Sequence, residues 1–181
     1  MNTFDLIKQR YSPIIFSNKG IEENLLFPLF EAARWAPSAY NEQPWRFIYC
    51  PKTENIKYEK LFNCLVDANM EWAKTAPALM LVLARKNFSH NEKPNPFYRY
   101  DTGMAVMSFI MAAMEHKIYV HQMGGFSSEM ARDSFNISDD YDVISVAAIG
   151  YRGDTAVLTE ELKKRANTPR LRKDISQILL T

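Results

Sequence analysis

A continuous apolar run from Pro77 to Ala84, P-A-L-M-L-V-L-A, places the strongest constraint on how this chain folds. The run has the length of a strand, and it lacks the alternation of polar and apolar residues seen when one face of a strand meets water. Such a segment is typical of a strand that is covered on both faces. The sequence therefore predicts a strand inside a sheet, with other elements packed on each side of it.

A second constraint is a helix predicted from Asp101 to Ile118. Its central part, M-A-V-M-S-F-I-M-A-A-M, has Ser108 as its one polar residue. The segment is too short to cross a bilayer, and a helix that is apolar on all sides must be buried on all sides. In a chain of 181 residues this pattern favours a helix shared with a second copy, so we expect a homodimer.

Composition excludes several classes of protein. The length suits one domain spanning residues 1–181, which buries roughly 70% of the surface of the unfolded chain. The 22 basic residues nearly balance 21 acidic ones, so the net charge of +1 gives no general attraction to nucleic acid or to a membrane. Cys50 and Cys64 lack the spacing of a zinc site or a disulfide framework. The N-terminus has no apolar core of signal-peptide length, so we expect a cytoplasmic protein.

Polar residues gather in one short loop after a predicted helix. That helix stops at Ala36-Pro37, because proline disfavours the helical conformation of the residue before it and donates no backbone N–H. A strand is predicted to begin at Trp45, where large apolar residues alternate with others. An ordinary helix stop and turn would use the same residue types. The loop between the two elements contains Ser38, Tyr40, Asn41, Glu42 and Gln43.

The segment A-A-R-W-A-P-S-A-Y-N-E-Q-P-W-R-F resembles the signature of the nitroreductase-like FMN-dependent oxidoreductases. This resemblance implies an α+β fold, with a central mixed β-sheet of four to five strands flanked by helices. It also implies a homodimer in which the C-terminal tails are exchanged between the subunits. The loop is expected to lie against the flavin, with the amides of Asn41 and Gln43 near the ring edge. The neighbouring residues expected to bind the cofactor are Pro37, Ser38, Ala39 and Tyr40.

A second part of the resemblance is the segment Arg10-Tyr11-Ser12. It follows a short helix for which Thr3 is the predicted N-cap, and Arg10 could simply neutralise the last carbonyls of that helix. The family has an R-x-S here that contacts the ribityl and phosphate groups of FMN. Many members then carry a basic residue two positions later, whereas this chain has Ile14. A missing cation near the pyrimidine edge of the flavin would affect the redox potential rather than binding.

The segment Gly124-Gly125-Phe126 is similar to a family segment whose backbone N–H points at flavin N5. By position that donor is Gly124, although a plain turn would use two glycines equally well. Asn69 corresponds to an asparagine near the pyrimidine side of the flavin, although an asparagine at a helix end is more often a cap. The chain contains neither G-x-G-x-x-G nor G-K-[ST], so it carries no Rossmann or phosphate-loop signature.

Basic residues near the C-terminus resemble the cluster that binds the FMN phosphate in this family. Arg170 and Arg172 fit that cluster, with Lys173 as an alternative, although basic residues near a terminus are most often just solvated. The phosphate carries about −1.5 to −2 charges at pH 7 and needs two or three charged or hydroxyl donors. We expect Arg10, Ser12 and the two tail arginines to supply them.

A polar stretch from Asn87 to Arg99 contains two prolines and several aromatic residues. It is either an ordinary surface loop or a lid over the site. In a lid, Phe97 and Tyr98 would stack on a planar substrate.

The resemblance implies an FMN-dependent NAD(P)H oxidoreductase. Hydride would pass from NAD(P)H to flavin N5 and on to nitroaromatic, quinone or similar flat acceptors, in a ping-pong cycle that needs no protein nucleophile or metal. An alternative is a flavin-binding storage, carrier or sensor protein with little turnover. A structural dimer without a flavin would leave the amide-rich loop and the basic tail without a role.

Overall fold

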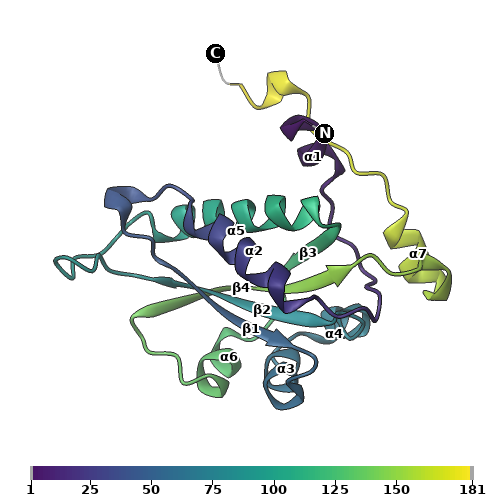
Figure 1. Cartoon of the computed structure of the whole chain (residues 1–181), viewed down its shortest axis with the longest axis horizontal. Coiled ribbons are helices and arrows are strands. Elements are labelled where there is room, and N and C mark those ends of the chain that lie inside the picture. The colour runs from purple at the N-terminus through teal and green to yellow at the C-terminus, as the bar shows by residue number, and fades with distance from the viewer. Residues whose placement is uncertain (1, 180–181) are drawn as a thin grey trace.

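The computed structural model describes residues 2–179 and has an α+β architecture (Figure 1). The helices are α1 (Thr3–Gln9), α2 (Glu23–Arg34), α3 (Asn55–Phe62), α4 (Asp67–Ala73), α5 (Tyr98–Glu115), α6 (Ser128–Ser134) and α7 (Glu160–Ala166). The strands are β1 (Trp45–Pro51), β2 (Ala78–Arg85), β3 (Ile118–Met123) and β4 (Tyr141–Tyr151). Short 3₁₀ turns are η1 (Ala39–Asn41), η2 (Thr155–Val157) and η3 (Ile175–Gln177).

The strands form one sheet in the order β1-β2-β4-β3. The described residues form four strands, which agrees with the prediction of four to five. The prediction of a mixed sheet is wrong for the described part of the chain, because all three strand pairs are antiparallel. β2 and β3 do run in the same direction, and α5 connects them. They are not neighbours, however, because β4 lies between them and runs the opposite way.

The apolar run of β2 is covered on both faces, as its sequence predicts. Leu79, Leu81 and Leu83 belong to a core that includes residues of α3, α4 and α6. Met80 and Val82 belong to a second core, shared with α2 and α5. Successive side chains of a strand point to opposite faces, so a strand between two helical layers needs apolar residues at every position. Figure 1 shows these helices on the two sides of the sheet.

The first helix differs in detail from its prediction. Asn2 is its N-cap, and its Oδ1 accepts a hydrogen bond from the N–H of Asp5 at 2.9 Å. Thr3, the predicted cap, is therefore the first residue inside the helix. The helix ends at Gln9, so Arg10 is its C-cap and the next residues are free to follow an extended path.

The central helix α5 packs its inner side on the sheet through buried residues such as Ala105, Phe109 and Ala113. Its outer side leaves Met107 partly exposed, and Phe27 and Trp35, from α2 and its C-cap, are about three-quarters exposed. Within residues 2–179, no helix combines the length and the hydropathy needed to cross a membrane.

The chain after α7 leaves the body of the molecule and runs alongside α1 (Figure 1). Its apolar side chains are largely exposed, with Leu171 at 82% and Ile175 at 63%. A segment with this much exposed apolar surface has no core of its own within one chain.

Candidate functional site

An arginine-rich cavity of about 390 Å³ lies between α1, β3, the end of β4 and the C-terminal segment. Five arginines line it, and no Asp or Glu is among the described residues that do so. Such an accumulation of positive charge favours a strongly anionic ligand. The arginines are Arg10, Arg152, Arg165, Arg170 and Arg172.

The cavity brings together the two basic segments that were predicted to bind the phosphate. Arg10, Tyr11 and Ser12 line it from one side, and Arg170 and Arg172 from the other. A guanidinium N–H of Arg170 donates to the backbone carbonyl of Lys8, which attaches the tail to α1. Burial, followed by the nearby charges of Arg170 and Arg172, lowers the pKa of Arg10. The cations therefore repel one another until an anion enters the cavity.

Sequence reasoning missed two of these arginines. Arg152 directly follows β4, and its guanidinium lies 5.7 Å from the centre of the Tyr11 ring, which in turn makes an edge contact with Tyr119 at 5.0 Å. Arg165 lies in the last turn of α7. The signals available were a basic residue at the end of a predicted strand and another in a polar helix, and neither is specific without the structure.

His121 on β3 also lines the cavity. Its Nδ1 lies 2.8 Å from the carbonyl oxygen of Pro13, and its ring stacks on Trp72 with 4.3 Å between ring centres. Burial, followed by the charges of Arg165 and Arg10, lowers the pKa of His121, which favours the neutral ring that donates from Nδ1 to Pro13. The histidine thereby holds the segment after α1 against the sheet. Ile14, the departure from the family pattern, is 95% buried and packs in the core.

Gly124 and Gly125 form the turn at the end of β3. The carbonyl of Gly125 accepts hydrogen bonds from Asn69 Nδ2 at 2.9 Å and from the N–H of Val66 at 3.1 Å. Among the described residues, neither glycine N–H donates a hydrogen bond. A Cβ at Gly124 would meet nothing within 4 Å, so the space beside its Cα is open. Asn69 is thus placed at this turn, where its amide supports the backbone.

The loop at 37–43 is held in an unusual conformation. Tyr40, Asn41 and Gln43 have φ values of 52°, 57° and 52°, in the left-handed region that non-glycine residues rarely occupy. Backbone conformations of this kind cost of order 1–3 kcal/mol each and cluster at functional sites. The loop is anchored by the N–H of Ala39, which donates to the buried carboxylate of Asp101 at 3.0 Å.

The structure does not bring this loop to the arginine cavity within one chain. Asp101 lies in the first turn of α5, whereas the cavity lies beside β3, which begins just after α5 ends. An 18-residue helix is about 27 Å long. Figure 1 shows the segment after α2 at the opposite end of α5 from α1 and α7. The predicted site residues therefore fall into two groups at opposite ends of one helix.

The two aromatic residues assigned to a lid lie at the start of α5. Phe97 is the N-cap and Tyr98 is the first helical residue, so the helix begins three residues earlier than predicted. Phe97 is half exposed. Their role toward a substrate stays a prediction. No group of His, Cys, Asp or Glu within residues 2–179 could hold a metal ion.

Comparisons with known proteins agree on one family. The model of the nitroreductase family matches residues 7–151. A crystal structure described as an oxidoreductase containing FMN is 31% identical and superposes with a TM-score of 0.90, covering 97% of this chain and 89% of the other. A nitroreductase family protein from Clostridium difficile is 23% identical, with a TM-score of 0.77 and coverage of 99% and 98%.

Relatives by sequence point the same way. A protein of Archaeoglobus fulgidus, provisionally named NADH dehydrogenase/NAD(P)H nitroreductase, is 28% identical over 153 residues, which are 82% of this chain and 84% of the relative. An iodotyrosine deiodinase from Thermotoga neapolitana is 30% identical over 136 residues, which are 63% of this chain and 68% of the relative.

Proposed function

Because this chain belongs to the nitroreductase family, we propose that it is an FMN-dependent NAD(P)H oxidoreductase that acts on nitroaromatic, quinone or similar flat acceptors. The observation that carries the proposal is the cavity lined by five arginines, with no carboxylate among the lining residues that the structure describes. A phosphate monoester is an anion that such a cavity would bind strongly. A solved relative with a TM-score of 0.90 contains FMN, which supports the same ligand.

Within one chain, the cavity and the turn at Gly124 suit the two ends of FMN. Gly124 follows His121 by three residues, so the two are about 10 Å apart along the edge strand β3. The phosphate would bind to Arg10, Ser12 and the tail arginines. The ring would occupy the open space at Gly124, whose unpaired N–H would donate toward N5.

We propose that a second copy of the chain completes the site. The loop at 37–43 lies at the far end of α5 from the cavity, so its Asn41 and Gln43 cannot reach the flavin bound to their own chain. In a homodimer packed through the outer side of α5 and the exposed Phe27 and Trp35, the loop of one subunit would meet the flavin of the other. The exposed apolar tail after α7 would cross to the partner subunit and bury its side chains there.

When bound, FMN would supply the redox chemistry, hydride transfer from NAD(P)H to the acceptor. The contribution of the chain is to bind, orient and shield that group. The arginines would neutralise the phosphate, the N–H of Gly124 would donate to flavin N5, and the buried Ile14 would keep the neighbouring wall of the cavity apolar.

The test is an absorption spectrum of the purified protein between about 300 and 600 nm, before and after anaerobic addition of NADPH or NADH. Flavin bands that bleach with one nucleotide, followed by reoxidation with a nitroaromatic or a quinone, are expected. A colourless protein that takes up no FMN would refute the proposal. Bleaching without reoxidation by any acceptor would favour a flavin store, carrier or sensor instead. Light scattering in solution tests the dimer.

A further inference from the structure

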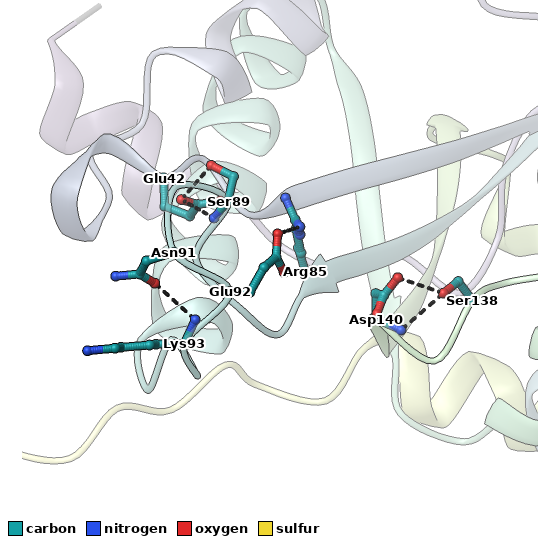
Figure 2. A network of polar contacts seen from close by, with 8 residues as sticks. All are labelled: Glu42, Arg85, Ser89, Asn91, Glu92, Lys93, Ser138 and Asp140. Atoms are coloured by element: carbon teal, nitrogen blue, oxygen red, sulfur yellow. Dashed lines mark hydrogen bonds and ion pairs between the residues drawn. The ribbon is translucent and has the colours of Figure 1, made fainter.

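Glu42 connects the loop at 37–43 to a separate part of the chain, the hairpin formed by residues 86–95. Its Oε2 accepts two hydrogen bonds from Ser89, from the backbone N–H at 2.9 Å and from the hydroxyl at 3.0 Å (Figure 2). One carboxylate oxygen thus holds two donors that are 47 residues away in sequence. Hydrogen bonds to a charged acceptor are roughly twice as strong as neutral ones.

Within the loop, the N–H groups of Asn41 and Glu42 donate to the carbonyls of Ser38 and Ala39, and Gln43 Nε2 donates to the carbonyl of Asn41 at 3.2 Å. These bonds close the loop on itself and do not attach its middle to another element. Ala39 is bonded to Asp101, and the N–H of Gln43 donates to the hydroxyl of Ser38 at 3.0 Å. Neither contact reaches outward from the middle of the loop, where Tyr40 and Asn41 adopt left-handed conformations. Glu42 is the residue next to them, and its side chain ties this strained part to a neighbouring element.

The hairpin that carries Ser89 is held together by its own hydrogen bonds and by an ion pair. The N–H of Phe88 donates to the carbonyl of Lys93 at 2.9 Å, and the N–H of Glu92 donates to the carbonyl of Phe88 at 2.9 Å. Arg85 at the base pairs with Glu92 at 2.7 Å (Figure 2). Phe88 is buried, and its ring meets the ring of Tyr40 edge-on at 5.6 Å between centres. The Tyr40 ring also lies 6.4 Å from the ring of His90, so the loop and the hairpin share the two hydrogen bonds to Glu42 and an aromatic cluster.

We propose that Glu42 is a positioning residue, whose bonds to Ser89 hold the loop in the conformation in which Asn41 and Gln43 present their amides to the flavin. The proposal rests on the proposed function, since the loop has a flavin to meet only if the protein binds FMN. It assigns to the hairpin a role as the support of the cofactor loop, in place of the lid predicted for residues 87–99. Preorganisation of this kind lowers the ordering cost of binding.

The first test uses the protein without cofactor, so that it does not depend on FMN. Amide hydrogen exchange is measured for wild type, Glu42→Ala and Glu92→Gln. Glu42→Ala should speed exchange about fivefold in both 37–43 and 86–95, because about 1 kcal/mol of hydrogen bonding is lost. Glu92→Gln is the matched control, since it weakens the pair with Arg85 inside the hairpin and leaves the bonds from Ser89 to Glu42 in place. Unchanged exchange in 37–43 of Glu42→Ala would overturn the proposal.

The second test measures FMN affinity, the visible flavin spectrum and the split of kcat and KM for a quinone. Glu42→Ala should bind FMN about five- to tenfold more weakly and shift the flavin bands, because the loop amides lie near the ring. Glu42→Gln keeps an acceptor oxygen, so it should recover most of the affinity and the band position. A general loss of stability would not be rescued in this selective way.

The outcomes separate the two proposals. Wild-type protein that takes up no FMN refutes the proposed function before any variant is made, and with it the role of Glu42 toward the cofactor. Wild-type protein that binds FMN, with equal affinity and spectrum in Glu42→Ala, overturns the positioning role alone. If Glu42→Ala does not fold, Ser89→Ala removes the hydroxyl bond while keeping the N–H bond, and it should show the same changes at a smaller size.

Discussion

Alanine substitutions at the two neighbouring glycines at the end of β3 form a matched pair. One substitution tests the packing of the turn, and the other tests the binding of a ligand in the open space next to it. Neither has a positive φ, so alanine is conformationally allowed at both positions. A Cβ at Gly125 would lie 2.8 Å from Asn69 Nδ2 and 2.9 Å from Val66 Cγ2, closer than real contacts allow. A Cβ at Gly124 would meet nothing within 4 Å. Gly125→Ala therefore tests how the packing of the turn affects stability, and Gly124→Ala tests how the open space at the turn affects FMN binding.

The expected magnitudes follow from these contacts. Overpacking costs about 1–3 kcal/mol, and replacing glycine by alanine returns about 0.4–1 kcal/mol by restricting the unfolded chain. Gly125→Ala should therefore lower the stability of the cofactor-free protein by about 1–2 kcal/mol, which lowers Tm by about 2–8 °C at this chain length. Gly124→Ala should leave Tm unchanged or raise it by about 1–4 °C, because its methyl group meets no atom and only restricts the unfolded chain.

The assay is thermal unfolding with and without FMN. At a concentration 100 times Kd, a ligand stabilises the folded state by about 2.7 kcal/mol. If the ring occupies the open space at the Cα of Gly124, a methyl group there should weaken binding about tenfold or more, removing about half of this stabilisation. Equal losses of stability in both cofactor-free variants, or a wild-type Tm for Gly125→Ala, would show that the reasoning from the turn geometry is wrong. A full FMN shift in Gly124→Ala would show that the ring does not lie there.

Three further predictions concern single side chains. Arg10→Ala should weaken FMN binding about 10- to 100-fold, because it removes a charge-assisted bond to the phosphate, and titrations at low and high salt should show a smaller salt dependence than wild type. The pKa of His121 is lowered in the folded chain, whereas in the unfolded chain it keeps its ordinary value of about 6.5. Below that pH the unfolded chain binds more protons than the folded chain, so the free energy of unfolding should fall as the pH decreases. Urea unfolding of His121→Gln at several pH values should lack this contribution. Burial raises the pKa of Cys50 to about 12, so above pH ~9 the folded chain keeps a proton that the unfolded chain loses, and this thiol should lower the stability by about 1.4 kcal/mol per pH unit. Burial also raises the pKa of Cys64, so urea unfolding of Cys50→Ala should show a smaller slope than wild type but not a flat line, and the wild-type slope in the variant would contradict the assignment.

The sequence contained enough to find the strands β1 and β2, because the residues of β1 alternate at strand spacing and those of β2 form an unbroken apolar run. The run D-V-I-S-V-A-A-I-G-Y at 142–151 is also typical of a strand, and it forms β4. β3 was missed as a strand because it is a short edge strand with the polar residues His121 and Gln122 in its middle. An edge strand has little apolar signal of its own, and its pairing with β4 is a long-range contact that no local pattern encodes.

The residues of the candidate site also divide into those that the sequence indicated and those that only the structure reveals. Local motifs indicated Arg10, Ser12 and the amides of the loop, because each lies in a short characteristic string. The gathering of Arg152 and Arg165 into the same cavity depends on the ends of β4 and α7 meeting, which only the tertiary structure reveals. The sequence also could not show that Asn41 lies at the far end of α5 from Arg10, because neither motif encodes its distance from the other.

The separation of Asn41 from Arg10 along α5 predicts that two defective variants can complement each other. If each flavin is bound by the cavity of one subunit and the loop of the other, then a subunit carrying Arg10→Ala and a subunit carrying Asn41→Ala fail for different reasons. Mixed dimers of the two would contain one site with both defects and one site with none. Two inactive proteins, unfolded and refolded together, would thus complement each other, with half of the sites in each mixed dimer restored.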